Sequence, residues 1–170
     1  ALLLRANDKV RFVPNGDNGT SASISYYAWD QTGSDSAGDK VSVATRGGEN
    51  AFSSAADTAS ITVSDVNDAP VLTAASPILT SIGEDATTNN GQTVADILDS
   101  SVTDIDTGAL EGIALYGLTS GNGKWQYSLN GGTDWTDVGD VSQSQALLLR
   151  ATDKVRFVPN GENGTSASIS

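Results

Sequence analysis

Apolar and polar residues alternate along several short segments of this chain, which is the pattern of strands with one buried face. Residues 58–63 alternate in this way and predict a strand, and residues 71–73 predict another. Residues 9–13 alternate apolar with charged side chains, and residues 21–29 follow them beyond a turn rich in Pro, Asn, Asp and Gly. We therefore expect 9–13 and 21–29 to form an antiparallel hairpin.

The first 25 residues return near the end of the chain, at an offset of 145 residues. Residues 1–25 and 146–170 differ only where Asn7 corresponds to Thr152 and Asp17 to Glu162, so 23 of 25 positions match. This near-identity indicates a recent duplication, and a period of 145 residues has the size of a whole domain. We expect the parent protein to be a tandem array of all-β domains.

The repeat also predicts how the chain is divided. Residues 1–67 are expected to be the C-terminal part of one repeat, 64–70 the linker, and 71–170 the N-terminal part of the next repeat. The expected partners are therefore neighbouring repeats of the same chain or identical chains, and the sequence leaves open whether strands pass between chains.

Composition excludes several classes of function. The 170 residues include no Cys and no His, which removes disulfides, Cys/His zinc sites and Ser-His or thiol catalysis. No feature beyond the abundance of Asp suggests a pair of catalytic carboxylates, so we do not expect an enzyme. No apolar run approaches the roughly 20 residues of a membrane span, and the first residues do not resemble a signal peptide.

The charge distribution favours a cation as partner. The net charge is −12, and no Lys or Arg lies between Arg46 and Lys124, whereas acidic residues recur throughout that stretch. Nucleic acid is disfavoured because phosphate binding needs basic patches. The alternative is a solvated acidic surface that only keeps the protein soluble.

Oxygen-bearing side chains are concentrated in the predicted linker, at Asp65, Asn67 and Asp68, and Pro70 closes the run. Ca²⁺ binds six to eight oxygens and accepts carboxylates, amide oxygens and backbone carbonyls. Pro70 favours an extended spacer at this point. Either these residues bind Ca²⁺, or they form a polar turn whose side chains cap backbone groups.

A second acidic pattern, Asp104-x-Asp106, lies in the following segment. In an extended chain the two carboxylates lie on one side, about 6–7 Å apart along the chain. This spacing suits one or two Ca²⁺ ions.

The pattern Asp65-x-Asn67-Asp68-x-Pro70 resembles the inter-domain calcium linker of cadherin repeats. That family places a glutamate after the linker, an Asp-x-Asp further on and an Ala-x-Asp near a late strand end. The residues that match these in type and order are Glu84, Asp104 with Asp106, and Asp30 after Ala28 and Trp29. The sequence departs from the family in two ways: Ala69 stands where cadherins usually have a second Asn, and residues 1–67 contain no Asp-Arg-Glu triplet.

The resemblance implies a seven-stranded, Ig-like, cadherin-like antiparallel β-sandwich with Ca²⁺ at its poles. It implies that the Ca²⁺ ligands of this joint are Asp65, Asn67, Asp68, the carbonyls of Val66 and Ala69, and Asp104 and Asp106. Glu84 would serve the following joint and Asp30 the preceding one. Cadherin-like repeats of giant secreted bacterial adhesins commonly carry a joint like residues 66–70, which implies a calcium-stiffened spacer at the cell surface.

An aromatic segment at 123–135 predicts a tight hairpin with Asn130, Gly131 and Gly132 at its tip. Its pattern from Ser128 to Trp135 resembles the Asp-box hairpin of sialidase-like propellers, where the box is a structural turn. The side chains of Trp125, Tyr127 and Trp135 either pack in the core or form a platform for a glycan or a host-cell protein. The second interpretation makes the chain a binding module rather than a spacer.

Overall fold

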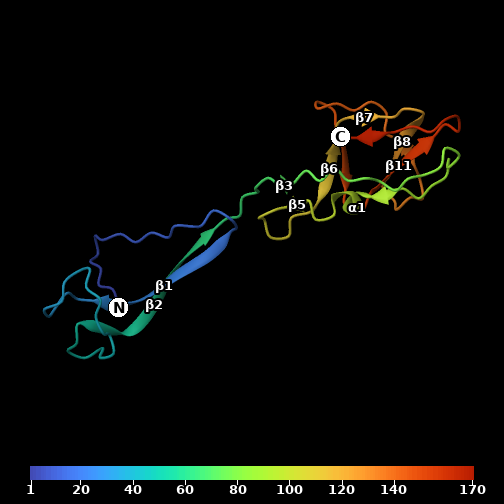
Figure 1. The fold of residues 1–170 in the computed structure, drawn as a ribbon. Coiled ribbons are helices and arrows are strands. Elements are labelled where there is room, and N and C mark those ends of the chain that lie inside the picture. Colours follow the sequence, from blue (N-terminus) through green and yellow to red (C-terminus); the bar gives the residue numbers. More distant parts are fainter. The chain divides into compact units, whose positions relative to one another are not determined.

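A computed structural model of the protein describes all 170 residues and divides them into two compact units. Unit 1 is Ala1–Asp68 and unit 2 is Ala69–Ser170, so the division falls inside the predicted linker at 64–70. Almost all of the regular structure is β-strand in antiparallel sheets, as the sequence predicts (Figure 1). None of the helical structure has the length and apolar character of a membrane span.

Unit 1 is built on one two-stranded ribbon. Strand β1 (Thr20–Trp29) pairs antiparallel with β2 (Phe52–Val63), and the register runs from Thr20 opposite Val63 to Trp29 opposite Phe52, with one irregularity before Trp29. Strand β2 contains the predicted strand 58–63. Leu3 is the buried apolar residue of this unit, and its N–H donates to the Asp39 carbonyl at 3.0 Å.

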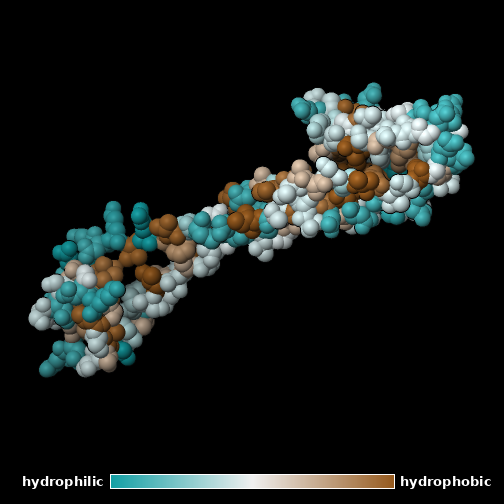
Figure 2. Space-filling view, viewed as in Figure 1, coloured by the Kyte–Doolittle hydropathy of each residue, from teal (hydrophilic) through white to brown (hydrophobic).

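The ribbon carries apolar side chains that face solvent. Ile24, Tyr26 and Ile61 are all exposed, and Figure 2 shows hydrophobic residues at the surface of this unit. An isolated two-stranded ribbon is only marginally stable in water, because it cannot bury one of its faces. Unit 1 therefore has little hydrophobic core of its own.

Unit 2 contains the remaining sheets. The largest has the strand order β4-β11-β8-β9, and three further strand pairs are β3 with β5, β6 with β10, and β7 with β12. The strand bounds are β3 Val71–Leu72, β4 Gln92–Thr93, β5 Val102–Thr103, β6 Gly112–Leu115, β7 Leu118–Thr119, β8 Gly123–Ser128, β9 Thr136–Asp137, β10 Leu147–Arg150, β11 Lys154–Pro159 and β12 Ser168–Ile169.

The core of unit 2 forms where a short helix meets two of these sheets. Helix α1 (Val94–Leu98) buries Val94 and Leu98 against Leu149 of β10 and Val155 of β11. Thr93 caps the helix, because its hydroxyl accepts from the Asp96 N–H while the Asp96 carboxylate accepts from the Thr93 N–H. The Thr-x-x-Asp spacing is the sequence signal for this helix, which the strand pattern did not predict.

The hairpin expected from residues 9–13 and 21–29 is wrong. Strand β1 pairs with β2 instead, and residues 9–13 form no strand. In the second copy of the repeat, β11 pairs with β4 and β8, while β12 pairs with β7 in another sheet. Both copies contain the expected turn, but each strand beside the turn pairs with a segment further away in the sequence.

The turn before these segments is the same in both copies. The Arg5 N–H donates to the Asp8 carboxylate at 2.8 Å, and the Arg150 N–H donates to Asp153 at the same distance. In each copy the guanidinium of the arginine pairs with the aspartate as well. Asp153 is buried, however, whereas the Asp8 side chain is partly exposed.

We expect Asp153→Asn to lower the free energy of unfolding of unit 2. It should also make that free energy depend less on pH in the acid range. Hydrogen bonds from the Arg150 side chain lower the pKa of the Asp153 carboxyl. This carboxylate therefore stabilises the fold above its unfolded pKa of about 3.9, and the contribution is lost as pH falls through the lower folded pKa. At neutral pH the variant should lose about 1–3 kcal/mol, because a buried charged acceptor is removed.

Thermal melts between neutral pH and the acid limit of folding measure this effect. Above pH ~4 the variant should have a lower melting temperature than the parent. Below pH ~4 the melting temperature of the variant should fall less than that of the parent. Asp8→Asn is the matched control, because Asp8 makes the same local bonds at a more exposed position. Equal effects of the two substitutions would contradict the role assigned to burial.

Candidate metal site

Pairing of β3 with β5 brings Pro70 and Asp104 together. Val71 of β3 lies opposite Thr103 of β5. Pro70 precedes β3 and Asp104 follows β5, so the two residues continue the antiparallel ladder at the same end. The sequence predicted β3, and this pairing links the start of unit 2 to its Asp-x-Asp pattern.

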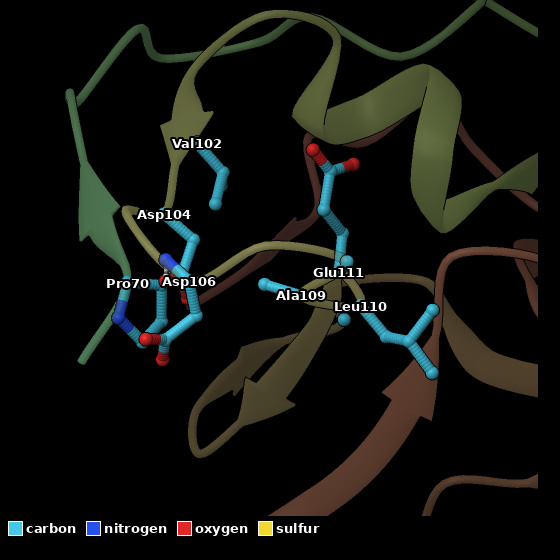
Figure 3. A pocket seen from close by; sticks show the side chains of 9 residues that line it. Pro70, Val102, Asp104, Asp106, Ala109, Leu110 and Glu111 are labelled. Carbon is cyan, nitrogen blue, oxygen red and sulfur yellow. Dashed lines mark hydrogen bonds between the residues drawn. The ribbon is translucent and has the colours of Figure 1, made fainter. Parts of the chain in front are cut away.

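A pocket of about 290 Å³ opens at this end of unit 2. Its lining residues are Pro70, Val102, Asp104, Asp106 and the five residues 108–112 (Figure 3). The side chains of Asp104 and Asp106 lie near each other beside Pro70, whereas the Glu111 carboxylate points in another direction. The structure therefore brings together the two acids of the Asp-x-Asp pattern in one pocket.

The loop that follows β5 is held by two turns. The Asp106 N–H donates to Asp104 Oδ1 at 2.9 Å, and the Ala109 N–H donates to the Asp106 carbonyl at 3.2 Å. Both aspartates are partly buried, and Asp106 Oδ1 is shielded from solvent. The turns thus hold two carboxylates close together where water screens their charges less.

The donor set of this pocket fits a hard cation, because carboxylates and loop carbonyls are the ligands that Ca²⁺ takes. No basic side chain lines the pocket. Two carboxylates supply fewer than the six to eight oxygens of a Ca²⁺ shell, so carbonyls, water or further side chains must complete it. No group of three or more acidic, His or Cys side chains in the structure is arranged to hold a metal.

The linker residues Asp65, Asn67 and Asp68 belong to the end of unit 1. Asp65 Oδ1 accepts a hydrogen bond from the Gly19 N–H at 2.7 Å, which closes the open end of the β1–β2 ribbon. A Cβ at Gly19 would lie 2.7 Å from the Asp65 nitrogen, so glycine permits this approach. The Asn67 side-chain amide donates to the Asp68 carbonyl at 2.7 Å. These are contacts of the kind that a polar turn makes.

Asp30 belongs to unit 1, and Glu84 of unit 2 is not among the residues that line the pocket. Asp30 follows the last residue of β1, as the sequence predicts, and its Oδ1 accepts from the Thr32 N–H and hydroxyl at 2.8 and 2.6 Å. The hydrogen bond from the Thr32 side chain is the main reason that the pKa of Asp30 is lowered. Glu84 is exposed in a turn of unit 2.

The aromatic segment forms a hairpin from β8 and β9, but the second strand lies just beyond 123–135 and the loop between the paired residues Tyr127 and Thr136 is longer than the tight turn predicted. Ser128 Oγ accepts from the Gly132 N–H at 2.8 Å, and Asn130 Oδ1 accepts from the Asp134 N–H at 2.9 Å, so these residues act as a structural turn. Trp125 is only 4% exposed and packs edge-on against Phe157 with ring centroids 5.4 Å apart.

The other two aromatic residues of the hairpin are also engaged. Tyr127 packs against the core cluster, and the Arg156 guanidinium lies 4.1 Å from the centroid of the Trp135 ring. The three rings therefore do not form one exposed platform.

The sequence analysis did not identify the loop at 108–112 as part of the pocket. The sequence feature that could have indicated this loop is the pair of glycines four residues apart, Gly108 and Gly112. Gly108 has a φ of +82°, and a Cβ at Gly112 would lie 2.6 Å from the Leu149 carbonyl oxygen. These positions allow the loop to turn back and enter β6 beside β10.

Comparison of the chain with protein-family models, with curated proteins and with solved structures finds no match.

Proposed function

We propose that this chain is a calcium-stiffened spacer from a tandem repeat protein of the bacterial cell surface, an adhesin or a filament. In this proposal a complete repeat is an Ig-like, cadherin-like sandwich of about 145 residues. The observation that carries the proposal is the pocket in which Asp104 and Asp106 lie beside Pro70 at the start of unit 2. The near-identical repeat supports a spacer, because spacers multiply readily as whole domains.

The proposed ion acts by neutralising carboxylates that otherwise repel one another. Asp104 and Asp106 are held in one pocket by local turns, so their repulsion persists unless a cation offsets it. Binding to the folded state alone stabilises that state. By the resemblance of the linker, Asp65, Asn67 and Asp68 are proposed as further ligands, with Glu84 and Asp30 serving neighbouring joints.

The aromatic hairpin supports the alternative of a glycan- or protein-binding module less well. Trp125 is buried and Tyr127 packs on the core, which removes two of the three rings that a platform would use. The acidic pocket is therefore the better-supported site in unit 2.

A calcium titration of thermal stability tests the proposal. Extracellular calcium modules bind with a Kd of about 10⁻⁴–10⁻³ M. Ten millimolar Ca²⁺, roughly 10–100 times that Kd, should then stabilise unit 2 by about 1.4–2.7 kcal/mol. For a unit of this size, we expect the melting temperature to rise by at least about 5 °C. Asp104→Ala/Asp106→Ala should remove most of this rise.

The matched control is Asp85→Ala/Asp140→Ala, which removes two exposed carboxylates from the same unit but away from the pocket. It should keep the calcium response. Mg²⁺ at the same ionic strength should give a smaller rise, because it requires a tighter octahedral shell. A calcium response that is absent in the parent chain, or equal in both double variants, would exclude the pocket as the calcium site.

A further inference from the structure

The first acidic residue of the linker is held by a segment that lies far from it in the sequence. The Gly19 N–H donates to Asp65 Oδ1 at 2.7 Å, across 46 residues. This distance is at the short end for an N–H donor, as expected when the acceptor is an ionised carboxylate. The Asn67 side chain, by contrast, donates to the carbonyl of the next residue, Asp68. Unit 1 therefore holds the Asp65 carboxylate from outside the linker.

The Gly19 nitrogen is itself held from both sides. The next residue, Thr20, begins β1 and lies opposite Val63 in the β1–β2 ladder. In the preceding turn, Asn15 Nδ2 donates to Asp17 Oδ2 at 2.6 Å, and the Asp17 N–H donates to Asn15 Oδ1 at 3.4 Å. A strand and a turn thus fix the position of this N–H donor.

The close approach to the linker explains why residue 19 is a glycine. A Cβ at Gly19 would lie 2.7 Å from the Asp65 nitrogen, 3.0 Å from the Val63 carbonyl oxygen and 3.1 Å from the Asp65 Cα. All three are backbone atoms, so no side-chain rotation could relieve the overlap. Gly16 has a φ of +96°, whereas Gly19 does not have a left-handed conformation that would itself favour glycine. The contact with the linker is therefore what requires a glycine at this position.

We propose that Gly19 is a positioning residue for the calcium ligand Asp65, and that its N–H orients this carboxylate for the ion. This inference rests on the proposed function, in which Asp65 is one of the ligands. Carboxylates that bind metals are oriented by hydrogen bonds from surrounding groups, and those groups tune the affinity. The bond from Gly19 uses Oδ1 and leaves Oδ2 for Ca²⁺, and the exposure of Asp65 gives an ion access to it.

The bond acts by ordering the ligand before the ion binds. An exposed aspartate has several rotamers, and binding of an ion must select one of them at a cost in entropy. The Gly19 N–H makes this selection in advance, which reduces that cost. Because such coupling is reciprocal, an ion on Asp65 should also stabilise the bond to Gly19. Calcium should therefore slow hydrogen exchange at the Gly19 amide.

A calcium titration of the whole chain, followed by the amide NMR signals of residues 64–70 below the melting temperature, tests this role. We expect Gly19→Ala to raise the Kd for Ca²⁺ at least about tenfold, because the alanine Cβ displaces Asp65 from the N–H donor. The Kd of the folded chain separates positioning from stability. A purely structural glycine would change the melting temperature and leave this Kd unchanged.

Gly16→Ala is the matched control in the same turn. Its φ disfavours alanine, but a Cβ there would meet no atom within 4 Å. Gly16→Ala should therefore weaken the turn and keep the Kd of the parent chain.

Asp65→Asn separates the hydrogen bond from the ion without adding any bulk. The amide keeps an oxygen that can accept from the Gly19 N–H, but it lacks the charge that attracts Ca²⁺. Without calcium, the Gly19 amide should exchange at nearly the same rate in this variant as in the parent chain. Calcium should then slow that exchange in the parent chain and not in Asp65→Asn.

The outcomes separate this inference from the proposed function. If the parent chain and Gly19→Ala bind Ca²⁺ with the same Kd, or if Gly16→Ala raises the Kd as much as Gly19→Ala, the positioning role is wrong and the calcium site stands. If Gly19→Ala raises the Kd while Asp104→Ala/Asp106→Ala binds as tightly as the parent chain, the positioning role holds and the pocket is not the site. A parent chain that binds no Ca²⁺ overturns both.

Discussion

Replacing Leu149 with alanine is expected to lower the free energy of unfolding of unit 2 by about 2–5 kcal/mol. Leu149 is 2% exposed and packs with Val94, Leu98 and Val155 in the core cluster. Its neighbour Leu148 points the other way along β10 and is 74% exposed. Leu148→Ala should therefore change the free energy of unfolding by less than about 0.5 kcal/mol.

Denaturant unfolding followed by tryptophan fluorescence measures both variants, because the buried Trp125 lies in the same unit. The repeat supplies a second comparison, in which the other leucine of the pair is the buried one. Leu3, the counterpart of the exposed Leu148, is buried, and Leu4, the counterpart of the buried Leu149, is exposed. Similar losses for Leu148→Ala and Leu149→Ala would mean that β10 does not present one face to this core.

Gly91→Ala is expected to cost at least about 3 kcal/mol, through backbone strain and steric overlap together. Gly91 has a φ of +58°, a conformation that side chains disfavour. A Cβ there would overlap the Val155 carbonyl oxygen of β11 and approach the Trp135 ring to 2.8 Å. Alanine must therefore push the chain before β4 away from β11. Urea unfolding should show a lower midpoint with an unchanged slope.

Gly131→Ala is the matched control for this prediction. Gly131 also has a positive φ, of +75°, but a Cβ there would meet no atom within 4 Å. It should cost only the conformational penalty, about 1 kcal/mol. If Gly91→Ala costs no more than Gly131→Ala, the close approach of this segment to β11 and Trp135 is wrong.

The strands could be predicted where apolar and polar residues alternate over a short segment. The strands predicted at 58–63 and 71–73 are present within β2 and as β3, and a hairpin starts with β8 in the predicted segment 123–135, but its second strand, β9, lies at 136–137. The predictions that failed concern which strand pairs with which. Residues 21–29 form a strand as expected, but its partner is β2 and not residues 9–13. Alternation of apolar residues indicates a buried face, but it does not identify the neighbouring strand.

The candidate metal site was likewise predicted only in part from the sequence. The spacing of Asp104 and Asp106 predicts two carboxylates close together, and the structure has them in one pocket. The roles of Pro70 and of residues 108–112 in lining that pocket required the pairing of β3 with β5. The hydrogen bond from Gly19 to Asp65 joins residues 46 apart in the sequence, which no motif could have indicated.

The duplicated segment shows which features follow from local sequence and which depend on contacts with distant segments. Its turns are the same in both copies, because an Arg–Asp or Asn–acid turn satisfies its hydrogen bonds within a few residues. Residues 154–159, Lys-Val-Arg-Phe-Val-Pro, are the partly buried strand β11, whereas the same six residues at 9–14 are exposed and form no strand. A strand satisfies its backbone groups and buries its apolar face only against other strands, so β11 exists where β8 and β4 are present to pair with it.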